Sequence, residues 1–201
     1  MINEFLGEPE TSKLVGLISS VNPKVVIEIG CNTGRTAARL LAAIPSIERY
    51  IGIDVPHGHE TTLACQRREV PVEAGLYAAN DARFFLFEAD SRTLTPADLE
   101  PCDAVFIDGD HSEGAVMHDS KLAHALTRPG GIIVWHDSGN PAVEVTPVLE
   151  KLKAEGWSIE SLENSWLAFM RVEAPKPVEP PAPLAEDELP SLTEIRSVTT
   201  E

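Results

Sequence analysis

The chain has 201 residues, 43% of them hydrophobic, so it is long enough for one domain with a full core. Its formal net charge of −16 disfavours nucleic acid or an anionic membrane as the main partner, because both bind basic surfaces. Three cysteines without paired spacing indicate reduced thiols in a cytoplasmic protein, and no apolar stretch is long enough for a membrane span or a signal peptide.

The first half of the chain predicts alternating helices and strands. Apolar residues recur with helical spacing over residues 9–21, and a short apolar run over 24–29 predicts a buried strand. A glycine-containing loop leads into a predicted helix over 34–44, which Pro45 ends. A second strand is expected over 50–54.

The alternation continues through the middle of the chain. A helix is expected near 61–68 in an otherwise unclear connection, followed by a third strand over 83–88. Residues 95–100 predict a short capped turn or helix, with Thr95 as the N-cap. A fourth strand over 103–107 and a helix over 113–126 follow.

The last part of the pattern predicts a turn, a strand, a helix and a hairpin. Residues 128–131 are expected to turn into a fifth strand over 132–135, and a helix is expected over 141–155. Two further strands joined at 163–165 predict an antiparallel hairpin. The three tryptophans and the phenylalanines of the third strand are expected in the core.

Strands that alternate with helices predict a doubly wound parallel sheet with helices on both faces, and the final hairpin makes the sheet mixed. We expect this domain to cover residues 1–172. Residues 173–201 hold six prolines among seven acids, a composition typical of a disordered or extended tail.

Five apolar runs each end in or next to an acidic residue. In an open α/β sheet the carboxyl ends of the strands form the crevice where ligands bind, so these acids are expected to line one edge. Such a site suits hydroxyls, amines or positive charge and disfavours phosphates. The five residues are Glu28, Asp54, Asp90, Asp108 and Asp137.

The segment VVIEIGCNTG around the first strand is the strongest local signal. Gly30 allows a tight turn, Gly34 allows close approach at the helix start, and Asn32 tolerates a left-handed backbone. The G-x-x-x-G spacing fits neither a dinucleotide fingerprint nor a phosphate loop, and Glu28 suits an ammonium or sulfonium group better than a pyrophosphate. An ordinary strand–turn–helix joint is the alternative.

Two later acidic positions favour a nucleoside-like ligand. Asp54 lies twenty residues after Gly34 at the end of the second strand, where a carboxylate can accept hydrogen bonds from both ribose hydroxyls. Asp90 and Ser91 follow the third strand and could meet the edge of a purine base, although the same pair also caps turns.

The fourth and fifth strands are followed by acids and histidines that could support catalysis. Asp108 and Asp137 could hold one hard cation such as Mg²⁺ or Mn²⁺. The alternative is that Asp108 shapes the ligand pocket and Asp137 bonds within its loop. His111 and His136 could take a proton from an acceptor hydroxyl, or could simply bond to backbone.

These motifs together resemble the class I S-adenosylmethionine-dependent methyltransferases. VVIEIGCNTG, YIGIDV, FEADS, AVFIDGDH and RPGGIIVWHD are similar, in this order, to the successive motifs of that family. The FIDGDH and WHD segments resemble a branch of small bacterial enzymes that includes sugar and macrolide O-methyltransferases, some of them metal-dependent. Asn32 stands where many members carry glycine.

The resemblance, which covers residues 10–172, implies a seven-stranded sheet of order 3-2-1-4-5-7-6 with strand seven antiparallel. It implies that Glu28 and Gly30 approach the methionine part of the cofactor, and that Asn32 and Gly34 belong to the same cofactor-binding loop. It implies that Asp54 approaches the ribose. It also implies that Asp90 and Ser91 approach the adenine, beside Asp108 in the same pocket.

The sequence therefore predicts methyl transfer from S-adenosyl-L-methionine to a small-molecule acceptor, most simply at oxygen. Asp108, His111 and His136 are the expected catalytic residues. Two other functions stay open at this point: a non-catalytic nucleotide-type binding protein of the same fold, and an NAD-dependent oxidoreductase.

Overall fold

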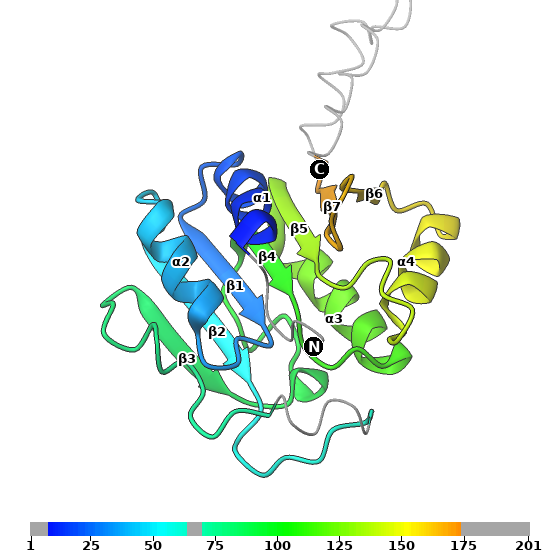
Figure 1. Ribbon diagram of the computed structural model, residues 1–201. Coiled ribbons are helices and arrows are strands. Elements are labelled where there is room, and N and C mark those ends of the chain that lie inside the picture. Colours follow the sequence, from blue (N-terminus) through cyan, green and yellow to red (C-terminus); the bar gives the residue numbers. More distant parts are fainter. Residues whose placement is uncertain (1–7, 64–69, 174–201) are drawn as a thin grey trace, which may run out of the picture.

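The computed structural model of the chain describes residues 8–63 and 70–173. Their strands form one seven-stranded sheet in the order β3-β2-β1-β4-β5-β7-β6 (Figure 1). Strands β1 to β5 run parallel, and β7 pairs antiparallel with both β5 and β6. This confirms the predicted mixed, doubly wound sheet and its strand order.

The parallel strands are largely buried, as the apolar runs predict, except for the edge strand β3, whose side chains are mostly exposed. Their bounds are Val25–Ile29 for β1, Arg49–Asp54 for β2, Phe84–Glu88 for β3, Cys102–Ile107 for β4 and Thr127–Trp135 for β5. The hairpin consists of β6, Glu160–Ser161, and β7, Ala168–Arg171. Asn164 takes a positive φ of 54° in its turn, which asparagine tolerates.

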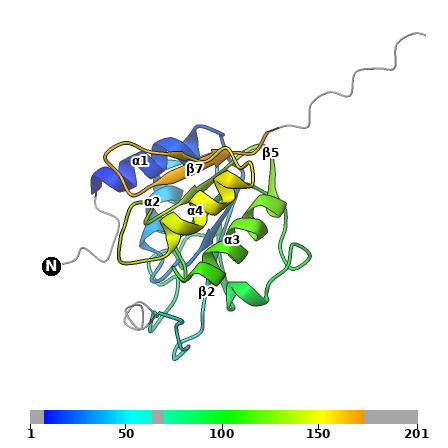
Figure 2. The same ribbon diagram turned by 90° about the vertical axis from the view of Figure 1, so that its right-hand side faces the viewer.

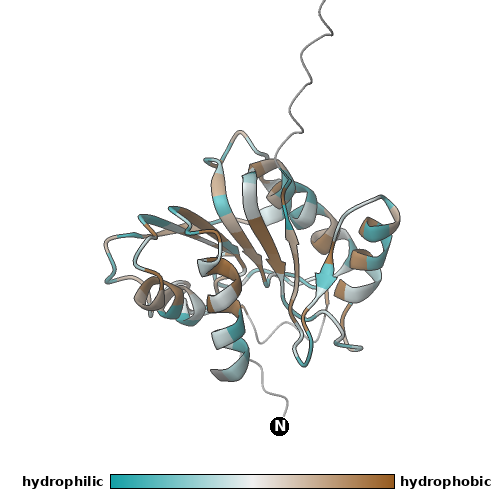
Figure 3. Ribbon diagram, turned by 90° about the horizontal axis from the view of Figure 1, so that it is seen from above, coloured by the Kyte–Doolittle hydropathy of each residue, from teal (hydrophilic) through white to brown (hydrophobic). Residues whose placement is uncertain are grey.

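Two pairs of helices cover the two faces of the sheet (Figures 2 and 3). Helices α1, Glu8–Ser19, and α2, Arg35–Ala43, pack on one face, and α3, Glu113–Leu126, and α4, Val145–Ala154, pack on the other. Within the described residues no helix is both long and apolar enough to cross a membrane.

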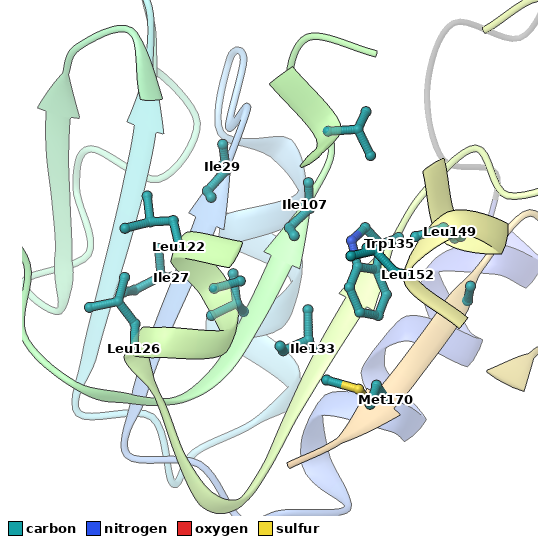
Figure 4. Packing of buried hydrophobic residues seen from close by; sticks show 14 of the residues in the cluster. Ile27, Ile29, Ile107, Leu122, Leu126, Ile133, Trp135, Leu149, Leu152 and Met170 are labelled. Atoms are coloured by element: carbon teal, nitrogen blue, oxygen red, sulfur yellow. The ribbon is translucent and has the colours of Figure 1, made fainter. Parts of the chain in front are cut away.

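Successive strand residues alternate between two hydrophobic cores. Ile27 and Ile133 belong to the core under α3 and α4, whereas Val26 and Val134 belong to the core under α1 and α2. Figure 4 shows the first of these cores, with Trp135 fully buried between β5 and α4. The alternation fixes which strand residues can face either helix layer.

Some predicted bounds were wrong for identifiable reasons. The predicted turn over 128–131 lies inside β5, where the pairing with β4 shifts register and Gly130 has a φ of 86°. Helix α4 starts at Val145 rather than at 141, after a turn. Residues 95–100 form a turn, which is one of the two predicted alternatives, but the Thr95 hydroxyl donates to Asp98 and does not cap a helix.

Two other expectations fall partly outside the described residues. Residues 61–63 of the expected 61–68 helix are not helical, and 64–69 lie outside the description, as do residues 174–201 of the expected tail. The aromatic residues also differ from expectation, since the side chains of Phe85, Phe87 and Trp166 are exposed. The two phenylalanines lie on β3, which is an edge strand, and Trp166 lies in the β6–β7 turn region.

Candidate active site at the carboxyl edge of the sheet

A cleft opens beyond the carboxyl ends of β1, β2, β3 and β4. It encloses about 630 Å³ of empty space when the part open to solvent is counted, so the residues that line it, rather than its volume, indicate the ligand. Most of the residues predicted to bind the cofactor line it together. They are Gly30, Asn32, Asp54, Asp90, Ser91 and Asp108.

The loop after β1 needs its glycines for close backbone approach. Gly30 has a φ of 87°, and a Cβ at this position would collide with the backbone of Asp108. Gly34 has a φ of 77°, and its Cβ would lie 2.9 Å from the backbone of Gly75, outside the cleft wall. The loop therefore packs directly against the β4 end.

Asp54 is held at the end of β2 by the backbone around it. The Asn32 amide donates to its Oδ2 at 2.5 Å, and the Val55 amide donates to its Oδ1 at 2.8 Å. Burial raises the pKa of Asp54 to about 6, even though both amides favour the charged form. Its carboxylate is thus fixed in orientation and keeps lone pairs for a ligand hydroxyl.

Glu28 does not line the cleft. Its side chain lies on the α1–α2 face of the sheet, only 1% exposed, where Tyr50 donates a hydrogen bond to it at 2.9 Å. Burial raises the pKa of Glu28 to about 8. The structure therefore separates Glu28 from the other acids at this edge.

Asp90 and Ser91 form the far wall of the cleft. Asp90 caps the short 3-10 helix η2, Ser91–Thr93, and pairs with Arg92 at 2.7 Å. This arginine holds the pKa of Asp90 below its usual range. Behind the wall lies Asp119 of α3, which is fully buried, and burial raises its pKa to about 7. Asp119 carries no signal in the sequence, because acidic residues on helices are usually solvated.

A second cluster adjoins the cleft where β4 and β5 end. The Nδ1 atom of His136 lies 3.1 Å from Asp108 Oδ1 and 3.2 Å from Asp137 Oδ2. The Nε2 atom of His111 lies 3.3 Å from Asp137 Oδ2 and 3.5 Å from Asp108 Oδ1. The structure therefore brings together all four residues that the sequence places at these two strand ends.

The carboxylates and imidazoles of this cluster shift one another's pKa values. Burial works against the charge on His136, but Asp108 and Asp137 outweigh it and raise the pKa of His136 to about 11. Burial likewise works against Asp108, but His136 and His111 hold its pKa well below the usual range. In this arrangement His136 carries a proton at neutral pH.

Three of the cluster's side chains could hold a metal ion. One ligand atom each from Asp108, His111 and Asp137 lies within 4.8 Å of the other two. Asn140 donates to Asp137 Oδ1 at 2.6 Å, so its amide orients that carboxylate and its carbonyl turns elsewhere, to the Ala142 amide. The two carboxylates suit Mg²⁺ or Mn²⁺, whereas an imidazole ligand is more typical of a transition-metal ion, so within this pair the set favours Mn²⁺.

Two residues distant in sequence also reach the cluster. Glu10 of α1 lies 3.6 Å from His136 Nε2, and the ring of Trp166 lies 6.5 Å from that of His136, centroid to centroid. Glu10 carried no signal in the sequence beyond its place on a helix. Trp166 did carry one, because it directly follows a predicted hairpin turn, where side chains are commonly exposed.

Comparisons with known proteins agree with this arrangement. A family model described as a methyltransferase domain matches residues 27–138, which is more than half of the chain. A comparison with curated proteins finds no sequence that matches this chain. With this fold and this cleft, the chain belongs to the class I S-adenosylmethionine-dependent methyltransferases.

Solved structures show the same fold at low sequence identity. A proposed O-methyltransferase from Klebsiella pneumoniae is 20% identical, with a TM-score of 0.62 over 86% of this chain and 83% of the other. The O-methyltransferase TomG from Streptomyces achromogenes, in complex with SAM, is 18% identical, with a TM-score of 0.60 over 87% and 84%. The SAH-bound Podospora anserina methyltransferase PaMTH1 is 16% identical, with a TM-score of 0.60 over 86% and 81%.

Proposed function

We propose that the protein transfers a methyl group from S-adenosyl-L-methionine to a hydroxyl oxygen of a small molecule. The observation that carries the proposal is the position of the cleft. Asp108 belongs both to the cleft and to the His111–Asp137 cluster, so a nucleoside-sized ligand and an ionising hydroxyl would meet at one carboxylate.

The cleft fits the proposed cofactor on its chemistry. Asp54 would accept the ribose hydroxyls, Asp90 and Ser91 would face the adenine, and Gly30 leaves room for the methionine part. When bound, the cofactor supplies a methyl group on a positively charged sulfur. Glu28 is buried outside the cleft wall and its raised pKa keeps it neutral near pH 7, so we assign it no contact with that charge; its part is to accept the Tyr50 hydrogen bond behind the sheet edge.

The cluster fits a divalent cation, which we include in the proposal. Asp108, His111 and Asp137 would hold it, and it would lower the pKa of an acceptor hydroxyl. The structure of TomG holds SAM and that of PaMTH1 holds SAH, which supports the cofactor but not the metal.

The protein's own residues would align the reactants and receive a proton. Methyl transfer is an in-line displacement, so holding the acceptor oxygen behind the methyl carbon is the main contribution. Asp108, which lines the cleft and belongs to the cluster, would orient the acceptor hydroxyl. A neutral His111 would accept the hydroxyl proton, and the neighbouring carboxylates would stabilise the imidazolium that forms. His136 already carries a proton, so in place of the expected base role it would stabilise the negative charge that develops on the acceptor oxygen.

The test follows label from methyl-labelled S-adenosylmethionine into a metabolite extract. Asp108→Asn and Asp137→Asn should each abolish most incorporation while the melting temperature changes little. Asp98→Asn, an exposed aspartate in a turn, is the matched control and should keep full activity. No labelled product with the wild-type protein would contradict the proposal.

Chelation distinguishes deprotonation of the acceptor with the help of a metal ion from deprotonation by a histidine alone. With a cation at the cluster, EDTA should abolish activity and Mg²⁺ or Mn²⁺ should restore it. Without one, EDTA should have no effect, and His111→Ala or His136→Ala should lower the rate by about 10²–10⁴-fold. Activity that survives chelation and both histidine changes would contradict both forms.

A further inference from the structure

Trp166 is an exposed aromatic residue beside the proposed reaction centre. Its surface is 42% exposed, whereas Trp135 is fully buried. We propose that Trp166 is the acceptor-binding platform, on which an uncharged hydroxylated ring lies by its flat apolar face. This inference rests on the proposed function, since it names the class of acceptor for the same site.

Two hydrogen bonds to the backbone of Trp166 and one to the preceding residue tie this position to two other parts of the fold. Its amide donates to Glu10 Oε1 at 2.6 Å, and its carbonyl accepts from the Ser138 amide at 2.8 Å. The hydroxyl of the preceding Ser165 donates to the same Glu10 oxygen at 2.8 Å. The exposed indole is thus joined to α1 and to the loop after β5.

Helix α1 also holds the rest of the turn that carries Trp166. Lys13 donates to the carbonyl oxygens of Glu163 at 2.8 Å and Asn164 at 2.6 Å. Fixing a loop costs conformational entropy, and a loop fixed before binding spares the ligand that cost. An exposed indole on a preordered turn is therefore suited to binding and contributes little burial to folding.

The place of the indole connects it to the proposed chemistry. Its ring lies 6.5 Å from that of His136, centroid to centroid, with an angle of 56° between the planes. His136 in turn lies 3.1 Å from Asp108, which lines the cleft. A ring placed on the indole would therefore carry its hydroxyl toward the cluster.

The chemistry of the surroundings limits what could lie there. An indole face attracts aromatic rings and the C–H faces of sugars. Glu10, Asp108 and Asp137 surround His136, so a negatively charged acceptor would meet three carboxylates. The shared chemistry is thus an uncharged ring with a flat apolar face and at least one hydroxyl.

The experiment measures binding of two uncharged probes by ligand-observed NMR titration, with S-adenosylhomocysteine present. Catechol represents aromatic acceptors and methyl β-glucopyranoside represents sugars. We expect one of them to bind, and Trp166→Ala to weaken it about tenfold. Trp166→Phe should keep most of the affinity, and Trp166→Leu, which retains bulk without a π face, should lose it.

Phe85→Ala is the matched control, because Phe85 is 47% exposed on an edge strand and does not line the cleft. It should leave probe binding unchanged, and calorimetric S-adenosylhomocysteine affinity should be the same in every variant. Unchanged probe affinity in Trp166→Ala or Trp166→Leu would overturn the inference. So would binding of S-adenosylhomocysteine without either probe, whereas failure to bind S-adenosylhomocysteine at all would overturn the proposed function with it.

Discussion

Glu28 shows how one residue can be held in an unusual state by its neighbours. It lies on β1, where it pairs in register with Gly52 of β2, and Tyr50 donates a hydrogen bond to its carboxyl group. Burial outweighs the Tyr50 hydrogen bond, which favours the charged form, and raises the pKa of Glu28 to about 8. The carboxyl group is therefore neutral in the folded protein near pH 7 and charged in the unfolded chain.

This shift predicts a pH-dependent effect of Glu28→Gln. Below about pH 4.5 the carboxyl is protonated in both states, and as pH rises toward 8 the wild-type protein loses stability because only the unfolded state ionises readily. Glutamine cannot ionise, so the variant should gain on the order of 1–4 kcal/mol over wild type between pH 5 and pH 8.5. Urea denaturation at both pH values measures the difference.

Glu150→Gln is the control for that measurement, since Glu150 is exposed on α4. Its stability difference from wild type should not change with pH. A Glu28→Gln difference that is equally flat would show that the Glu28 carboxyl is already ionised in the folded protein.

At the scale of elements, α1 joins the two ends of the described domain. Its Glu10 and Lys13 together bind the turn between β6 and β7, about 150 residues later in the chain. The same Glu10 lies beside His136. The first helix thus supports both the hairpin and the proposed site, although it contributes nothing to the cleft wall.

We predict that Glu10→Ala lowers the free energy of unfolding by about 1–3 kcal/mol, because the Trp166 amide and the Ser165 hydroxyl lose their acceptor. Amide hydrogen exchange should speed up in β6 and β7. Glu10→Gln should restore both, because its carbonyl oxygen can accept the same bonds. Equal exchange rates in wild type and Glu10→Ala would show that the hairpin is held by other contacts.

Elements with strong periodicity were predicted closely, and elements set by tertiary pairing were not. The bounds of α3 match the predicted 113–126, because its apolar stripe and flanking residues define it locally. Strand β5 starts earlier than predicted, because Arg128, Pro129 and two glycines read as a turn although pairing with β4 continues around them. Only the partner strand reveals that difference.

At the scale of the whole molecule, parallel strand direction explains why much of the site could be predicted. Strands that run the same way end at one edge, so Asp54, Asp90 and Asp108 had to lie near one another. The side on which a strand residue projects was not predicted, and it places Glu28 away from the cleft. The contacts of Glu10 and Trp166 with the cluster could not be predicted, because they depend on how α1 and the hairpin fold back together.

The central claim is that this edge of the sheet binds S-adenosylmethionine, and calorimetric titration with S-adenosylhomocysteine tests it most directly. We expect saturable binding, no binding of NAD, and an Asp54→Ala variant weakened by about 1–3 kcal/mol, since the ligand's ribose hydroxyls would lose their acceptor. Asp98→Asn should bind as wild type does. Tight binding of NAD, or unchanged affinity in Asp54→Ala, would contradict the account.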